Sequence, residues 1–170
     1  MNAYSNIRFW SKLSSGREID GGSEASRINE INNQALLTDL NNAAKVAGVI
    51  PVVTTITEGK HGDASRHYSG FAVDIAAFSG IGGYGGGSNP SFTVAGNKLS
   101  VALQQLGYTL NVESGNVKAV LWKSKGHHNH LHVSNKGGGV GTPSQNQLYG
   151  DFTGSNNSPL SETPTGLQYF

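Results

Sequence analysis

Two segments of the chain carry apolar residues at the three- and four-residue spacing of an amphipathic helix. The first contains Leu36, Leu40, Ala43, Ala44 and Ala47, and the second contains Leu99, Ala102, Leu103 and Leu106. Each segment is followed by a glycine, Gly48 or Gly107, of the kind that ends helices in a left-handed conformation. The pattern therefore predicts two main helices.

Segments rich in β-branched residues predict the strands of a small antiparallel sheet. These segments are 50–57, 70–77, 108–112, 117–122 and 131–134. The Ser-Gly-Asn sequence at 114–116 is typical of a turn and predicts a hairpin between its two flanking segments. Residues 79–97 are rich in glycine and are expected to form a long loop. The fold class is therefore expected to be α+β, with the sheet flanked by the two helices.

The ends of the chain differ in composition from its middle. Residues 1–26 are polar and rich in Gly and Ser, so we expect a loosely packed leader. Residues 27–134 contain the predicted helices and strands. Residues 135–170 are dominated by Gly, Ser, Asn, Thr and Pro, and they bury too little apolar surface to offset their ordering entropy. We expect this tail to be extended or tethered to another protein as a docking arm.

Composition narrows the class of protein. The 170 residues include 24 glycines, with 36% hydrophobic and 14% charged residues, which excludes a coiled coil or a collagen. A net charge of +1 gives no electrostatic argument for binding nucleic acid or an anionic membrane. The absence of cysteine excludes disulfides and thiolate zinc sites. The sequence shows neither a membrane span nor a signal peptide. We therefore expect the protein to be made in the cytoplasm and not to be exported by a signal peptide.

The six histidines lie in two segments of the sequence. His61 and His67 are in KHGDASRHYSGFAVDI, and the other four lie within GHHNHLHVS. Histidine is the commonest metal-ligating side chain, and four within six positions are unusual. A catalytic zinc site needs three nitrogen or oxygen ligands and one open position for water.

Strand alternation predicts which of these side chains meet. Asp74 would point away from its apolar neighbours on the second strand, and His130 and His132 would share the polar face of the last strand. His67 lies in the loop that leads to Asp74. The expected ligands are therefore His67, Asp74 and one of His130 and His132, with another histidine left for acid–base chemistry.

Each of these features also has a purely structural interpretation. His67 and Asp74 could be a turn pair that holds a loop, although an inward carboxylate without a partner would be costly. His127 and His128 could belong to a surface patch that binds metal adventitiously. His61 is expected to be a solvated loop residue.

The two segments together resemble a known family. Residues 65–74, SRHYSGFAVD, resemble the S-x-H-x-x-G-x-A-x-D motif of the LAS zinc peptidases, which include lysostaphin-type enzymes, D-Ala-D-Ala metallopeptidases and sonic hedgehog. His130 and His132 match the partner motif H-x-H. The run GHHNHLHV is similar to that of the penicillin-insensitive murein endopeptidases, and SRHYSGFAVDIA is similar to phage-borne D-Ala-D-Ala peptidases. The resemblance covers roughly residues 27–134.

The resemblance implies a cofactor and a role for each matching residue. The cofactor would be Zn²⁺, and its ligands would be His67, Asp74 and His132. His130 would lie against the water or the transition state, and His127 would be a further histidine of the pocket. Ser65 would support the site and the substrate.

One position departs from the family pattern. The D-Ala-D-Ala branch has a general-base Glu three residues before the last ligand, whereas this chain has Asn129 there. An amide cannot accept the proton, so the base would be His130 or His127, or a glutamate such as Glu58 or Glu113. The departure favours the murein endopeptidase branch.

These patterns lead to one expected function and one alternative. The expected function is a zinc-dependent peptidoglycan peptidase, of endopeptidase or D-Ala-D-Ala carboxypeptidase type, that is phage-encoded and acts on cell-wall stem peptides during lysis or host penetration. It would be made in the host cytoplasm and reach the bacterial cell wall without a signal peptide. Tyr68, Tyr84 and Trp122 would line its substrate cleft, and the leader and tail would contact other virion proteins. The alternative is a hedgehog-like module that keeps zinc for stability and binds the wall or a partner without cleavage.

Overall fold

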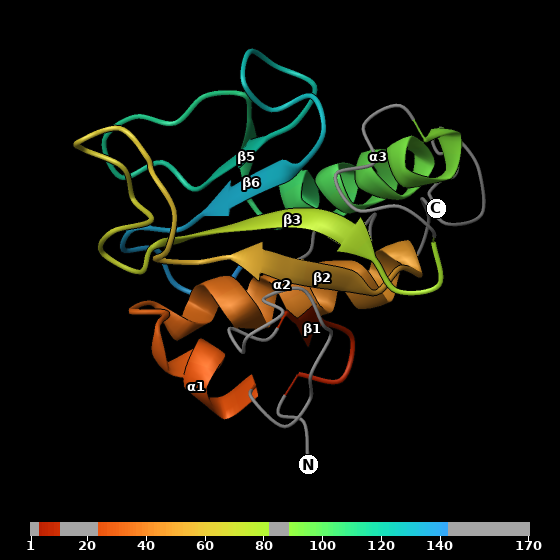
Figure 1. Cartoon of the computed structure of the whole chain (residues 1–170), viewed down its shortest axis with the longest axis horizontal. Coiled ribbons are helices and arrows are strands. Elements are labelled where there is room, and N and C mark those ends of the chain that lie inside the picture. Colours follow the sequence, from red (N-terminus) through yellow and green to blue (C-terminus); the bar gives the residue numbers. More distant parts are fainter. Residues whose placement is uncertain (1–3, 11–23, 82–88, 143–170) are drawn as a thin grey trace.

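The computed structural model describes residues 4–10, 24–81 and 89–142. These residues form a mixed α/β structure with one six-stranded sheet (Figure 1). Across the sheet the strands are β1 (Arg8–Phe9), β2 (Pro51–Thr55), β3 (Ala72–Phe78), β6 (Leu131–Ser134), β5 (Ala119–Leu121) and β4 (Thr109–Leu110). The helices in the described residues are α1 (Glu24–Asn29), α2 (Gln34–Ala47) and α3 (Pro90–Gln105). None of them is long and apolar enough to cross a membrane.

The middle of the sheet is antiparallel, as predicted, but both of its edges are parallel. β1 pairs with β2 in parallel, and so does β4 with β5. The predicted hairpin at 108–122 is therefore wrong. Asn111 has a φ of 58°, and its side chain exchanges two hydrogen bonds with the Trp122 backbone. The chain consequently turns aside after β4, and residues 111–118 form a loop that returns to begin β5 in the same direction.

α3 begins much earlier than the apolar pattern predicts. The Asn89 side chain accepts hydrogen bonds from two amides of the first turn and caps a helix that starts at Pro90. Residues 90–97 are therefore helical and not part of the predicted glycine-rich loop. The sequence pattern does not predict this part of the helix, because it contains Gly96 and glycine disfavours helix interiors. A Cβ atom at Gly96 would lie 2.5 Å from Trp122 Cζ2, so the missing side chain lets α3 approach the sheet.

The N-terminal segment is packed where the structure describes it. Ile7 and Phe9 are fully buried in the main core, and β1 extends the sheet beside β2. The prediction of loose packing for residues 1–26 is therefore wrong for residues 4–10. Two large apolar side chains bury enough surface to anchor a segment whose overall composition is polar.

The first residues of the predicted tail are also held against the domain. Asn135 is buried, and its backbone carbonyl accepts a hydrogen bond from the Asn33 side chain. The Gly141 amide donates to Oδ1 of the buried Asp39 at 2.7 Å. The rest of the predicted docking arm, residues 143–170, lies outside the described residues.

The two faces of the central strands differ in character. The apolar residues that join the main core with α2 and α3 include Val73, Ile75, Leu131 and Val133. Because side chains alternate along a strand, Asp74 and His132 project from the opposite face. The predicted alternation is confirmed, and it puts the polar residues on the face away from these helices.

Candidate metal centre

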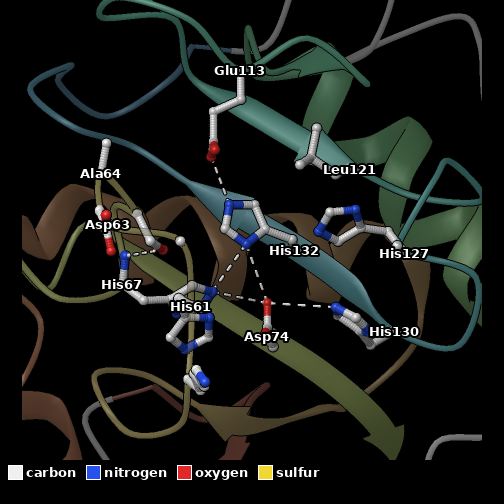
Figure 2. Close-up of a pocket in the computed structure, with 14 residues that line it drawn as sticks. His61, Asp63, Ala64, His67, Asp74, Glu113, Leu121, His127, His130 and His132 are labelled. Carbon is white, nitrogen blue, oxygen red and sulfur yellow. Dashed lines mark hydrogen bonds and ion pairs between the residues drawn. The ribbon is translucent and has the colours of Figure 1, made fainter.

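Three side chains each bring one potential ligand atom to a common point (Figure 2). His67 Nε2 lies 3.2 Å from Asp74 Oδ1 and 3.1 Å from His132 Nδ1. His132 Nδ1 lies 3.2 Å from Asp74 Oδ1. Both histidines are buried and Asp74 is half-buried. The structure therefore brings together the three residues expected to be ligands, and this group could hold a metal ion.

Strand register and a tight turn place these side chains. Asp74 on β3 and His132 on β6 are direct partners across the antiparallel pair, so they share one face of the sheet. His67 precedes β3 in a turn that is closed by a 2.9 Å hydrogen bond from the Gly70 amide to the His67 carbonyl. Gly70 has a φ of 73°, a conformation that favours glycine. The turn brings His67 back to Asp74.

Each histidine of this candidate centre is oriented through its other ring nitrogen. His67 Nδ1 lies 2.7 Å from the Ile56 carbonyl oxygen, which can only accept, so Nδ1 carries the proton and Nε2 presents a lone pair. His132 Nε2 lies 2.6 Å from Glu113 Oε2, which leaves Nδ1 facing the cluster. Outer partners of this kind are typical of metal-binding histidines.

The spacing and chemistry of the three atoms fit a tetrahedral divalent cation. Ligands about 2.0–2.1 Å from zinc in a tetrahedron lie about 3.3 Å from one another. The 3.1–3.2 Å separations of His67, Asp74 and His132 are close to that value. Two imidazole nitrogens and one carboxylate oxygen are also a donor set that Zn²⁺ accepts.

The electrostatics of the cluster favour a bound cation. Burial would raise the pKa of Asp74, but hydrogen bonds with His132 and His67 outweigh it and hold that pKa well below its usual range. Burial would lower the pKa of His132, but hydrogen bonds to Asp74 and Glu113 raise it to about 9. The carboxylates thus stabilise positive charge at this point, which a proton or a metal ion can supply.

The cluster opens into a cleft of about 590 Å³. One wall is the segment from Lys60 to Ser65, and the other includes Gly126, His127 and His130. Figure 2 shows His127 and His130 on one side of the cluster, with His61 and Asp63 on the other. The cleft is within the size range of ligand pockets, and the three potential ligand atoms line it.

His130 and His127 are placed to act on a group bound beside the cluster. His130 Nε2 lies 4.0 Å from Asp74 Oδ1, and its Nδ1 lies 2.9 Å from Asn129 Oδ1. The ring of His127 is 5.1 Å from that of His130. Burial lowers the pKa of both histidines, which keeps their rings neutral near pH 7.

The remaining predicted site residues have different surroundings. Ser65 lines the cleft, and its Oγ accepts a 3.2 Å hydrogen bond from the His67 amide. Tyr68 is 48% exposed, and its hydroxyl pairs with the backbone of His61 without lining this cleft. Trp122 is 4% exposed in the core against Phe92, so its assignment to the substrate cleft is wrong. Tyr84 lies outside the described residues.

The two glutamates considered as the general base, Glu58 and Glu113, have different surroundings. Glu58 is paired with Arg27 at 2.8 Å and accepts from the Ile56 amide, and it does not line the cleft. Glu113 lines the cleft but is bonded to His132. Sequence reasoning included Glu113 only as a possible base, because nothing local indicates that its loop reaches a residue on β6.

His61 also differs from its sequence interpretation. Its ring stacks on that of His67 with centroids 4.0 Å apart, and it lines the cleft instead of being a solvated loop residue. His128, by contrast, is exposed, as a surface histidine would be.

Comparison of the chain with family models, with curated proteins and with solved structures finds no match.

Proposed function

We propose that the protein is a zinc-dependent peptidase that hydrolyses peptide bonds of peptidoglycan. The observation that carries this proposal is the convergence of three ligand atoms at the side of an open cleft, with a further neutral histidine next to them. Structural zinc sites are usually closed by four protein ligands, whereas catalytic sites keep a position for water. The arrangement of His67, Asp74 and His132 beside a cleft favours the catalytic type.

The chain supplies groups for each part of such a hydrolysis. Zn²⁺ at this centre would supply Lewis acidity, which makes water more acidic and polarises a carbonyl. His130 is bonded through Nδ1 to Asn129, so its Nε2 is the nitrogen available on the cleft side. This Nε2 can accept a proton from the attacking water and return it to the leaving amine. His127, next to His130, can orient the substrate carbonyl or the leaving group.

The substrate class rests on the resemblance of the motifs. The SRHYSGFAVD segment and the downstream H-x-H pair are similar to those of cell-wall peptidases. The bonds hydrolysed in this cleft would be cell-wall peptide bonds that involve D-residues or side-chain amides. In this chain the endopeptidase and the D-Ala-D-Ala carboxypeptidase reaction would use the same residues, and Asn129 favours the endopeptidase reaction. A role in phage lysis or host penetration is part of this proposal.

A second candidate function is a zinc-stabilised binding module of the hedgehog-like kind. Asn129 favours it, because an amide stands where one branch of the resembling family has its carboxylate base. Such a module would bind the cell wall or a protein partner and would keep its metal without cutting.

The test is peptide release from purified sacculi by the zinc-loaded protein, by the chelator-treated protein and after zinc is restored. Mass spectrometry of the products identifies the bond, because an endopeptidase exposes a new amine within a crosslink and a carboxypeptidase releases D-alanine. We expect His132→Ala to abolish release and His128→Ala, an exposed histidine of the same segment, to preserve it. Zinc-loaded protein that binds sacculi and releases nothing would contradict the peptidase and support the binding module.

A further inference from the structure

Glu113 lies outside both sequence motifs, yet it contacts the candidate metal centre. It sits on the 111–118 loop, and its Oε2 lies 2.6 Å from His132 Nε2 and 2.5 Å from Ser134 Oγ. His132 and Ser134 lie on the same face of β6, so one carboxylate oxygen spans both side chains. A carboxylate at this distance holds a proton of His132 on Nε2 and leaves Nδ1, on the side of His67 and Asp74, as the nitrogen that can give up its proton to a metal ion.

The loop that carries Glu113 is held in place by a buried arginine. Arg66 is 8% exposed, and its guanidinium donates to the Val117 carbonyl at 2.6 Å and to the Gly115 carbonyl at 2.8 Å. It also donates to Ser134 Oγ at 2.9 Å, and its Nε lies 4.0 Å from Glu113. The planar fork of the guanidinium therefore fixes the loop against β6 at several points.

Arg66 is also the residue directly before His67 in the chain. The Phe71 amide donates to the Arg66 carbonyl at 2.9 Å, which ties the Arg66 backbone to the turn that precedes β3. The same residue thus fixes the segment carrying one ligand histidine and the loop that orients the other. This joint placement of two ligands is visible only in three dimensions.

We infer that Glu113 and Arg66 are positioning residues that set the zinc affinity of the centre. Glu113 orients His132, and Arg66 holds Glu113 at the distance where it can do so. The inference rests on the proposed metal centre but not on the proposed peptidase reaction. The competing explanation is that Glu113 and Arg66 only hold the 111–118 loop against β6. It predicts that their substitution lowers the stability of the fold without lowering the zinc affinity.

The test is a Zn²⁺ titration in competition with a chromophoric chelator, with the unfolding of the metal-free protein measured in parallel. Removal of an outer carboxylate typically weakens metal binding by roughly 10–100-fold, and we expect this for Glu113→Ala. Glu113→Gln keeps an acceptor and should lose less. Asp63→Asn is the matched control, because Asp63 is a carboxylate of the same cleft and is not bonded to His132.

Arg66→Lys tests the second member of the pair, since it keeps the charge and loses the fork that spans two carbonyls. We expect a zinc affinity between those of the wild type and Glu113→Ala. Histidine ¹⁵N spectra of the zinc-loaded protein should show the Nε2–H form of His132 in the wild type, with a changed signal in Glu113→Ala. Equal affinity of Glu113→Ala and Asp63→Asn would overturn the inference, and a wild type without zinc binding would overturn it together with the metal centre. Zinc binding without peptide release would overturn only the peptidase.

Discussion

Asp74 and His132 face each other across two antiparallel strands, and Asp74 Oδ1 lies 3.2 Å from His132 Nδ1. Register therefore places two of the three candidate ligands, and the turn before β3 needs to add only His67. A site built on paired strands is stiffer than one assembled from loops, which suits a centre whose ligand atoms must stay within a few tenths of an ångström.

Asp74→Asn is expected to remove zinc binding, because the amide loses the negative charge that attracts the cation. The loss should exceed the roughly 10–100-fold that is typical for outer partners. Zinc content measured after dialysis reports the result, and circular dichroism checks the fold. Retention of one zinc per chain in this variant would show that the metal lies elsewhere, whereas His128→Ala should retain its zinc.

His130→Ala is expected to keep zinc and to lose most of the peptide release. Acid–base groups typically contribute roughly 10²–10⁴-fold to a rate, so kcat should fall by that order while zinc affinity changes little. Rates of release from sacculi and zinc titrations separate the two effects. Loss of zinc in parallel with activity would instead make His130 a ligand.

Zinc binding near pH 7.5 is expected to release about one proton. The pKa of His132 in the metal-free protein is raised to about 9 by Asp74 and Glu113, so its ring is protonated at this pH and must lose a proton to bind metal. Asp74 is already ionised and releases none. Calorimetry in buffers of different ionisation enthalpy measures the number released. As pH falls below 9, apparent affinity should fall up to tenfold per unit, and a pH-independent affinity would contradict the assignment.

Glu58→Gln is expected to destabilise the fold at neutral pH by about 0.5–1.5 kcal/mol, because the buried Arg27 guanidinium loses its 2.8 Å carboxylate partner, which is partly exposed to solvent, and keeps the longer contact with Glu30. Burial would raise the pKa of Glu58, but the Ile56 amide and Arg27 lower it below its ordinary value of 4.5. A lowered folded-state pKa gives stability that is present above pH 4.5 and lost as pH falls through the folded value. Urea unfolding should therefore show a difference between wild type and variant that shrinks in acid. A constant difference would contradict the ion pair.

Gly96→Ala is expected to destabilise the protein although alanine favours helix. The added methyl group would lie 2.5 Å from Trp122 Cζ2, and overpacking costs about 1–3 kcal/mol against a helix-propensity gain of about 1 kcal/mol. Gly139→Ala is the control, because a Cβ there meets nothing within 4 Å. Urea unfolding measures both, and the loss should be smaller when Trp122→Leu is also present. A stabilised Gly96→Ala protein would contradict the packing.

Periodicity predicts α2, the central strands and the face that bears Asp74 and His132, since burial imposes it directly. Periodicity gives the wrong start for α3. Gly96 disfavours a helix locally, and the reason for a glycine there is the close packing against Trp122, which is distant in sequence. The turn signal at 114–116 gives the wrong pairing for β4, because Asn111 has a left-handed conformation that redirects the chain before this turn.

The site divides in the same way. His67 and Asp74 are close in sequence, on a loop and the strand that follows it, so their meeting is predictable. The contacts of His132 with Glu113 and of His67 with His61 depend on the path of loops, which no local pattern reports.

Ile7 and Phe9 are fully buried in the main core, so a stably folded fragment needs the N-terminal segment that carries them. A fragment trimmed to residues 27–134 would expose the edge of β2 at Val53 and remove two fully buried side chains from the main core. Such a fragment should aggregate even with every metal ligand present. Recombinant versions of the protein should therefore begin upstream of β1.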